Sequence, residues 1–320
     1  MITNYCTLFN VNYMSRGINL YNSLLKVSNN FRLYIFAFDN LSYDYLVNLN
    51  LKKTIIISLK DFEDSQLKRV KKSRTKTEYF WTCTGSTVLY LFKRYQIKSC
   101  TYLDADLYFY KNPKILIKES RKASCIISKH NYTEKYDQSD TSGIYCVQFM
   151  YFKNNILGKK ILLDWRKQCI KWCYNRFEDD KFGDQKYLDK WPKKYKGVYV
   201  LKNLGGGLAP WNIQKYKIMK NKKFQSKLNN KIVFDMIFYH FHNLKFINKN
   251  LTYIGGYKID DNIKKKIYYP YIKKILSINK NLHRHHNLKN IDLTESYFSG
   301  GIFLMRLIKR ILIKNNFLRI

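Results

Sequence analysis

Runs of apolar residues separated by polar turns divide the first part of the chain into strands and helices. Residues 3–9, 31–38 and 54–58 are short hydrophobic runs that predict buried strands. Apolar side chains recur at helical spacing over residues 78–95, and a further hydrophobic strand is predicted at 100–103. This alternation of strands and helices predicts an α/β fold, with a parallel sheet covered by helices on both faces.

The pattern weakens toward the C-terminus. Strands are still predicted at 123–128 and 145–152, but beyond residue 250 lysine and isoleucine dominate and the pattern favours helices. We therefore predict one domain over residues 1–250 and a basic, mainly helical C-terminal appendage over residues 251–320.

The last residues form a separate pattern. Over residues 300–320, Leu, Ile and Phe alternate with four cations that share one helical face, namely Arg306, Lys309, Arg310 and Lys314. This predicts a basic amphipathic helix, which either lies on an anionic membrane or packs against the protein like any other helix. No apolar run is long enough to cross a bilayer, and the N-terminus does not resemble a signal peptide. We expect a cytoplasmic protein, located at the inner face of the membrane if the helix binds lipid.

Composition adds little to this picture except charge. The 320 residues carry 59 Lys and Arg against 23 Asp and Glu, a formal net charge of +36. The cations are dispersed and no nucleic-acid-binding motif accompanies them, so we expect anionic partners in general and no specific nucleic acid. The seven cysteines form no CxxC pair, which disfavours a zinc site and a disulfide framework and indicates a reducing compartment.

Two carboxylates stand at the end of a predicted strand. Asp104 and Asp106 directly follow the hydrophobic residues 100–103, and ligands of open α/β sheets bind at the carboxyl ends of strands. Paired carboxylates are suitable ligands for Mn²⁺ or Mg²⁺, which can stabilise a diphosphate leaving group. The alternative is a solvated turn that happens to carry two acids.

Histidines in alternation form a second candidate. His240 and His242 would point to the same side of an extended segment, where an imidazole can complete a two-carboxylate metal site. Lys245 is close enough in sequence to reach a phosphate. The alternative is a pair of ordinary half-buried histidines.

Two glycine-containing segments are further candidates. Asp184 and Gln185 follow a glycine at the start of a predicted helix, where they could bind sugar hydroxyls, or Asp184 could simply cap the helix. In residues 205–212, three glycines permit close backbone approach and Trp211 could stack on a sugar ring, or the segment is a simple loop.

The order of these segments resembles a known group of enzymes. Asn12-Tyr13, YLDADLYF, FGDQKYLDKWP, GGGLAPWN and FYHFH follow one another as in bacterial nucleotide-diphospho-sugar transferases of the GT-A fold, similar to glycosyltransferase family 8. The resemblance covers roughly residues 3–250. It implies a Rossmann-like mixed sheet flanked by helices.

The resemblance also implies roles for individual residues. Asp104 and Asp106 would bind Mn²⁺ or Mg²⁺ and the donor diphosphate, with His240 as the third protein ligand. The remaining site residues would be Asn12 and Tyr13 at the nucleotide, Lys245 at a phosphate, and Asp184 and Gln185 beside the reacting sugar carbon.

The chain departs from family 8 at two places. The arginine expected in the helix before the acidic pair is replaced near Trp81, with Arg74 or Lys76 as substitutes, and the glycine and Lys-Pro-Trp ending expected after His240 are absent.

The predicted function is transfer of a hexose from a nucleotide-diphosphate donor, expected to be a UDP-sugar, to a glycan or lipid-linked acceptor. The resemblance implies retention of the anomeric configuration; if the reaction inverts, Asp184 is the candidate base. Two alternatives stay open at this point: a nucleotidyltransferase, which also uses paired acids, and a non-enzymatic basic nucleic-acid-binding protein.

Overall fold

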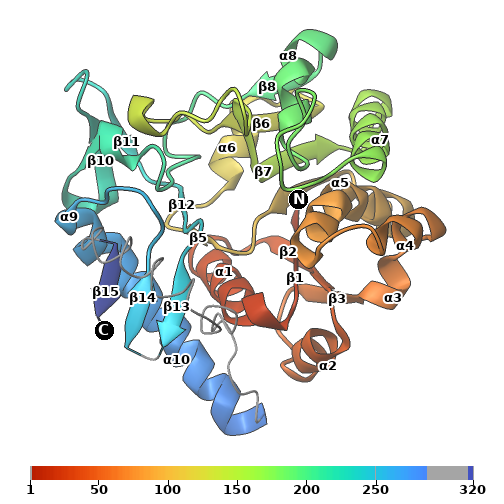
Figure 1. Ribbon diagram of the computed structural model, residues 1–320, viewed down its shortest axis with the longest axis horizontal. Coiled ribbons are helices and arrows are strands. Elements are labelled where there is room, and N and C mark those ends of the chain that lie inside the picture. The colour runs from red at the N-terminus through yellow and green to blue at the C-terminus, as the bar shows by residue number, and fades with distance from the viewer. Residues whose placement is uncertain (1, 249, 287–315, 320) are drawn as a thin grey trace.

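The structure is a computed structural model, and it describes residues 2–248, 250–286 and 316–319. Its centre is a seven-stranded mixed sheet with helices on both faces, and smaller sheets lie beside it (Figure 1). The prediction of an α/β fold with a mixed sheet flanked by helices is therefore confirmed.

The central sheet has the strand order β3-β2-β1-β4-β7-β6-β8. Its strands are β1 (Thr3–Phe9), β2 (Phe31–Ala37), β3 (Thr54–Ser58), β4 (Ser99–Leu103), β6 (Cys125–Lys129), β7 (Tyr145–Lys153) and β8 (Val198–Val200). The first four strands are parallel, whereas β7 runs antiparallel to both of its neighbours, β4 and β6. The carboxyl end of β4 consequently lies next to the amino-terminal half of β7.

Both faces of the sheet are buried, which explains the unbroken apolar runs. In β2, Tyr34 and Phe36 belong to the hydrophobic cluster on one face, and Leu33 and Ile35 to the cluster on the other. This is the arrangement expected of strands covered by helices on both sides.

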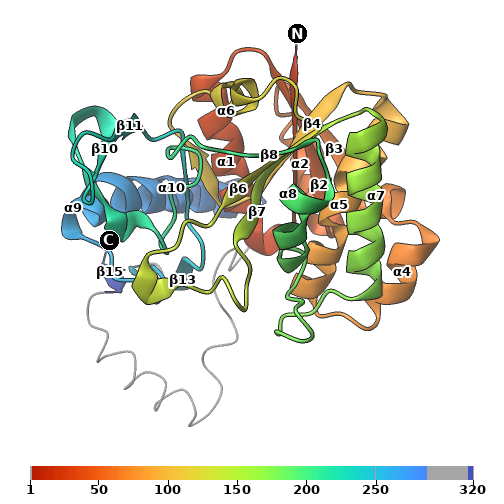
Figure 2. The same ribbon diagram turned by 90° about the horizontal axis from the view of Figure 1, so that it is seen from above.

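Two groups of helices cover the sheet (Figure 2). One face carries α3 (Leu59–Phe62), α4 (Ser65–Lys71), α5 (Lys76–Tyr95) and α7 (Ile156–Lys171), and the other carries α1 (Met14–Val27), α2 (Asn40–Asn48) and α10 (Tyr269–His286). Local sequence fixes their starts: Thr75 and Glu78 form a capping box at α5, and Asp39 caps α2.

Strand β5 and strands from the second half of the chain form three small sheets among the described residues. They consist of β5 (Leu107–Phe109) with β12 (Phe238–His240); β9 (Tyr216–Ile218), β10 (Lys223–Ser226) and β11 (Val233–Asp235); and β13 (Lys245–Asn248), β14 (Leu251–Tyr253) and β15 (Phe317–Arg319). The remaining helical segments are α6 (Lys114–Glu119), α8 (Trp191–Lys194), α9 (Asp261–Ile263), η1 (Val11–Tyr13), η2 (Glu134–Tyr136), η3 (Lys186–Lys190), η4 (Ile213–Lys215), η5 (Lys220–Lys222) and η6 (Lys264–Tyr268).

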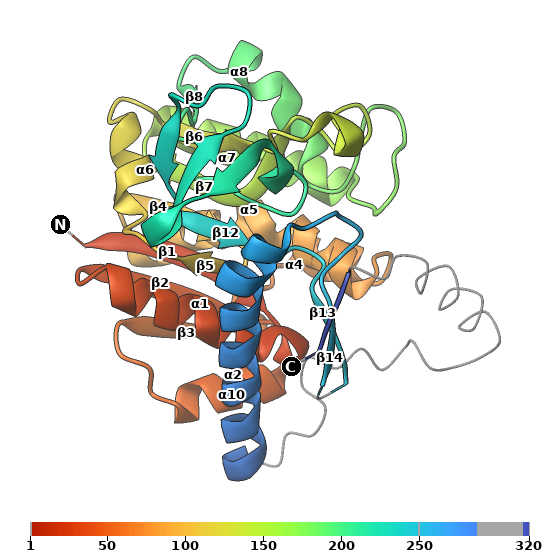
Figure 3. The same ribbon diagram turned by 90° about the vertical axis from the view of Figure 1, so that its left-hand side faces the viewer.

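The predicted domain boundary at residue 250 lies between β13 and β14, which pair with each other. Residues on either side of it, including Tyr239 and Tyr271, belong to one hydrophobic cluster. Helix α10 also lies alongside α1, which covers one face of the central sheet (Figure 3). The division into two domains stays a prediction, but the two parts share a core.

The predicted amphipathic helix over residues 300–320 lies mostly outside the described residues. Its described end is not helical: Phe317–Arg319 form β15, which pairs with β14 and buries Leu318. The pattern of apolar and basic residues over 317–319 is therefore that of a strand, not of a helix. Within the described ranges, no helix combines the length and hydropathy required to cross a membrane.

Candidate metal centre

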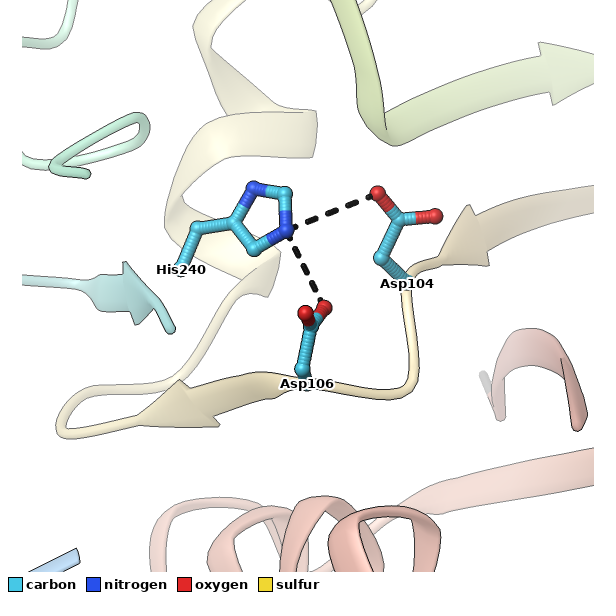
Figure 4. A group of neighbouring side chains, drawn as sticks. All are labelled: Asp104, Asp106 and His240. Carbon is cyan, nitrogen blue, oxygen red and sulfur yellow. Dashed lines mark ion pairs between the residues drawn. The ribbon is translucent and has the colours of Figure 1, made fainter. Parts of the chain in front are cut away.

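Three side chains from two distant parts of the chain meet at the carboxyl end of β4 (Figure 4). His240 Nε2 lies 3.0 Å from Asp106 Oδ1 and 3.8 Å from Asp104 Oδ2. One potential ligand atom from each residue lies within 4.8 Å of the others. The acidic pair is thus not a fully solvated turn, because the side chains of Asp104 and Asp106 are 28% and 12% exposed and that of His240 is 5% exposed.

The backbone explains why these residues meet. Strand β4 ends at Leu103, and a turn through Asp104 and Asp106 leads into β5. Strand β5 pairs antiparallel with β12, which places His240 opposite Leu107. The His240 N–H also donates to the carbonyl of Leu208 (2.9 Å). A turn after one strand and the end of another therefore converge on a single point.

Gln148 of β7 fixes the orientation of His240. Its side chain is fully buried, and its Oε1 lies 2.8 Å from His240 Nδ1. An amide oxygen only accepts hydrogen bonds, so Nδ1 must donate the proton. In the neutral imidazole, Nε2 then directs its lone pair toward both carboxylates. This arrangement is stable when Nε2 binds a proton or when a cation lies between the three groups.

The charges of the three side chains strongly affect one another's pKa values. Burial raises the pKa of Asp104 to about 6, despite the opposing charge of His240. Burial acts the same way on Asp106, but the charge and hydrogen bond of His240 outweigh it and lower the pKa to about 2. For His240, burial opposes protonation, yet Asp106 raises the pKa well above its ordinary value. A proton on His240 thus holds the place that a cation would take.

The three residues fit a divalent cation. Two carboxylates offer the hard oxygen ligands that Mg²⁺ and Mn²⁺ prefer, and an imidazole nitrogen is also a good ligand for Mn²⁺. The hydrogen bond from His240 Nδ1 to Gln148 is the outer contact that usually orients a metal-binding histidine.

Of the two alternating histidines, His240 is the one that joins the carboxylates within the part of the chain that the structure describes. The rings of His240 and His242 both pack against Trp211, with centroid distances of 5.3 and 5.4 Å. Trp211 is 3% exposed and its Nε1 donates to the carbonyl of His130. The expectation that a sugar ring stacks on Trp211 is therefore not supported, because the Trp211 ring is buried against the two histidine rings.

Asp184 and Gln185 lie in a buried turn after Gly183, whose φ of +50° favours glycine. Asp184 is 5% exposed, and its Oδ2 has no hydrogen-bond partner among the described residues. Burial, reinforced by the charge of Asp104, raises the pKa of Asp184 to about 7. Asp184 does not cap the following helix η3, since the residue at that position is Gln185, whose Nε2 instead donates to the carbonyl of Ser142 (2.8 Å).

Asn12 and Tyr13 lie in η1, directly after β1, and both are exposed. Lys245 begins β13 and lies near enough to His242 for their charges to interact. The structure therefore places Asn12 and Tyr13 just beyond the carboxyl end of β1, and Lys245 near His242. Their contacts with a nucleotide stay predictions.

Sequence reasoning missed Arg16. It lies in the first turn of α1, and it is 4% exposed. Its guanidinium donates to the carbonyls of Leu244 (3.0 Å) and Asn12 (3.4 Å), and its charge helps to lower the pKa of Asp106. Arg16 thus connects the first loop, the segment after β12 and the acidic pair.

No family model matches the chain. It is 26% identical over 277 residues to the uncharacterized protein YfnD of Bacillus subtilis (strain 168), covering 84% of this chain and 87% of YfnD. The uncharacterized protein YfnF of the same strain is 25% identical over 262 residues, covering 78% and 84%.

Solved structures resemble the whole fold. The galactosyltransferase LgtC, in complex with donor and acceptor sugar analogues, has a TM-score of 0.51 at 10% identity, covering 86% of this chain and 96% of that one. The glycosyltransferase GlyE of Streptococcus pneumoniae TIGR4 has a TM-score of 0.50 at 10% identity, covering 92% and 66%. At these identities the similarity concerns the fold. This chain therefore has the fold of the GT-A glycosyltransferases.

Proposed function

We propose that this protein transfers a sugar from a nucleotide-diphosphate donor to a glycan or lipid-linked acceptor, using Mn²⁺ or Mg²⁺. The observation that carries the proposal is the meeting of Asp104, Asp106 and His240 at the carboxyl end of β4. In open α/β sheets, this is where ligands bind. The GT-A fold supports the same reaction class.

In this scheme Asp104, Asp106 and His240 hold the cation and thereby position the diphosphate of the donor. The cation, when bound, neutralises the charge that develops on the leaving diphosphate. Gln148 keeps the His240 ring in the tautomer whose Nε2 faces the carboxylates.

The loops around the cluster would bind the rest of the donor. Asn12 and Tyr13 are exposed at the end of β1 and would hold the nucleotide, for which we propose uridine. Lys245 would contact a phosphate, and Arg16 keeps the Asn12 and Leu244 segments together through its hydrogen bonds.

Asp184 and Gln185 would lie at the sugar, for which we propose a hexose. If the configuration is retained, the acceptor attacks from the leaving-group face and a donor phosphate oxygen takes its proton, so no enzyme base is required. If it is inverted, Asp184 is the base, and its pKa of about 7 suits proton transfer at neutral pH. The resemblance to family 8 favours retention.

For the setting of the reaction we propose the cytoplasm, with the acceptor at the inner face of the membrane. All seven cysteines are buried free thiols, which supports a reducing compartment.

A thermal-shift panel tests the proposal. Wild type and Asp104→Asn are heated with UDP-sugars, other nucleotide sugars, nucleoside triphosphates or a short DNA duplex, each with Mn²⁺ or with EDTA. We expect a nucleotide sugar to raise the melting temperature of the wild type only with Mn²⁺, and to leave Asp104→Asn unchanged, because a ligand stabilises the native state in proportion to its occupancy. Equal stabilisation of both proteins, or stabilisation by DNA alone, would contradict it.

A further inference from the structure

A pocket lies at the other end of β5 from the metal ligands. Asp106 directly precedes the strand, whereas this pocket is formed by its last residues together with the end of α1, with η5 and with α10. Its volume is about 230 Å³. The residues that give it its chemistry are three lysines and three tyrosines, namely Lys26, Lys222, Lys274, Tyr108, Tyr110 and Tyr271.

Lys274 points into this lysine–tyrosine pocket from α10. Its Nζ donates to the hydroxyl of Tyr108 and lies 4.1 Å from the centroid of that ring. An ammonium has three N–H donors, and Tyr108 is the one acceptor that the described residues provide. Burial lowers the pKa of Lys274. An anion in the pocket would accept the remaining hydrogen bonds and restore the charge.

The other two lysines add charge to the same space. Lys222 Nζ lies 5.4 Å from the centroid of the Tyr110 ring. Burial raises the pKa of Tyr108, and the charge of Lys26, which lines the same pocket, acts in the opposite direction. In the described part of the chain, no carboxylate forms an ion pair with any of the three lysines. The nearby acid Asp235 pairs instead with Lys111 (2.9 Å).

We propose that the lysine–tyrosine pocket binds a phosphate group, from either a small soluble molecule or a lipid headgroup. A phosphate offers several oxygen acceptors and more than one negative charge, which matches three ammonium groups better than a single carboxylate does. The volume is below the roughly 300–1,000 Å³ of pockets that enclose a drug-sized molecule, so it suits a phosphate with a small substituent. The proposal concerns a site separate from the metal centre and does not depend on sugar transfer.

Two variants of equal net charge test the proposal. The pocket variant is K26Q/K222Q/K274Q, and the control is K52Q/K68Q/K72Q, whose three lysines are exposed around α4 and before β3. Pyrophosphate binding is measured by calorimetry in EDTA, which removes binding through a divalent cation. Vesicle binding is measured with phosphatidylcholine alone and with added phosphatidylglycerol. Circular dichroism confirms that each variant folds.

We expect the pocket variant to bind pyrophosphate about tenfold more weakly than the control, because charge-assisted hydrogen bonds are lost. If pyrophosphate binds neither protein but the pocket variant loses binding to phosphatidylglycerol vesicles, the phosphate comes from a lipid headgroup. Equal behaviour of the pocket variant and the control in both assays would overturn the proposal, since the attraction would then be a general effect of net charge.

Discussion

Gln148 contacts two of the three candidate metal ligands at once. Its side-chain Oε1 lies 2.8 Å from His240 Nδ1, and its backbone carbonyl accepts the N–H of Asp104 (3.0 Å). Because Gln148 is fully buried in the middle of β7, neither contact competes with water. The rigid centre of the sheet therefore determines the geometry of the metal centre.

Replacing Gln148 should weaken metal binding without unfolding the protein. Gln148→Leu removes the acceptor that orients His240, and loss of such a contact lowers metal affinity by roughly 10–100-fold. The Mn²⁺ dissociation constant from calorimetry measures the effect. Ser128→Ala is the matched control. Ser128 Oγ lies 3.5 Å from Gln148 Nε2, which is a weak contact. The Ser128→Ala variant should therefore bind Mn²⁺ with an affinity near that of the wild type. Equal affinities for wild type and Gln148→Leu would contradict the role of Gln148.

The glycines before β12 should differ sharply in their tolerance of a side chain. A Cβ at Gly205 would lie 1.9 Å from the carbonyl oxygen of Asp235, whereas at Gly207 the nearest atom would be 3.6 Å away. Gly205→Ala should lower the free energy of unfolding by about 1–3 kcal/mol, because the backbone must move. Gly207→Ala should leave the free energy of unfolding nearly unchanged. Urea denaturation of both variants checks this, and similar midpoints would show that the close approach at Gly205 is not required.

Asp184 should make stability depend on pH. Its ordinary pKa is 3.8, and burial raises it to about 7 in the folded state. Between these values the unfolded chain has released the proton that the folded protein keeps. The favourable contribution is thus complete below pH 3.8 and is lost as pH rises toward 7, by about 4 kcal/mol at most.

Asp184→Asn should remove that part of the pH dependence. Urea denaturation at pH 5 and pH 7.5, without metal, should show the variant gaining stability relative to the wild type at the higher pH. Replacement of the exposed Asp44 by Asn serves as the control. A wild-type and an Asp184→Asn protein that lose stability in parallel would argue against a buried, protonated Asp184.

Much of the fold could be predicted because both faces of the central sheet are buried. Strands β1 and β3 were predicted at the residues where they occur, since a strand covered on two sides is a continuous apolar run. The acidic pair was predicted for a related reason: two carboxylates directly after such a run stand out. The short strands β5 and β12 carry no such signal, because their pairing joins segments about 130 residues apart.

The residues that support the site were harder to predict. Gln148 is a polar residue within an otherwise apolar strand, and this was the available signal for a buried hydrogen bond. Arg16 was not among the predicted site residues, because its burial depends on Leu244, a residue far away in sequence. Trp211 was interpreted as a possible stacking face for a sugar ring, because a glycine-rich segment does not reveal that its tryptophan packs against His240.

Binding of Mn²⁺ to two matched histidine variants tests the central claim most directly. The electron paramagnetic resonance signal of free Mn²⁺ is followed during titration with wild type, His240→Ala and His242→Ala, each with and without UDP. The structure predicts that His240→Ala binds Mn²⁺ at least about tenfold more weakly, and that His242→Ala, which lacks only a neighbouring ring, stays close to wild type. Undiminished binding by His240→Ala, or equal losses in both variants, would contradict a metal centre formed by Asp104, Asp106 and His240.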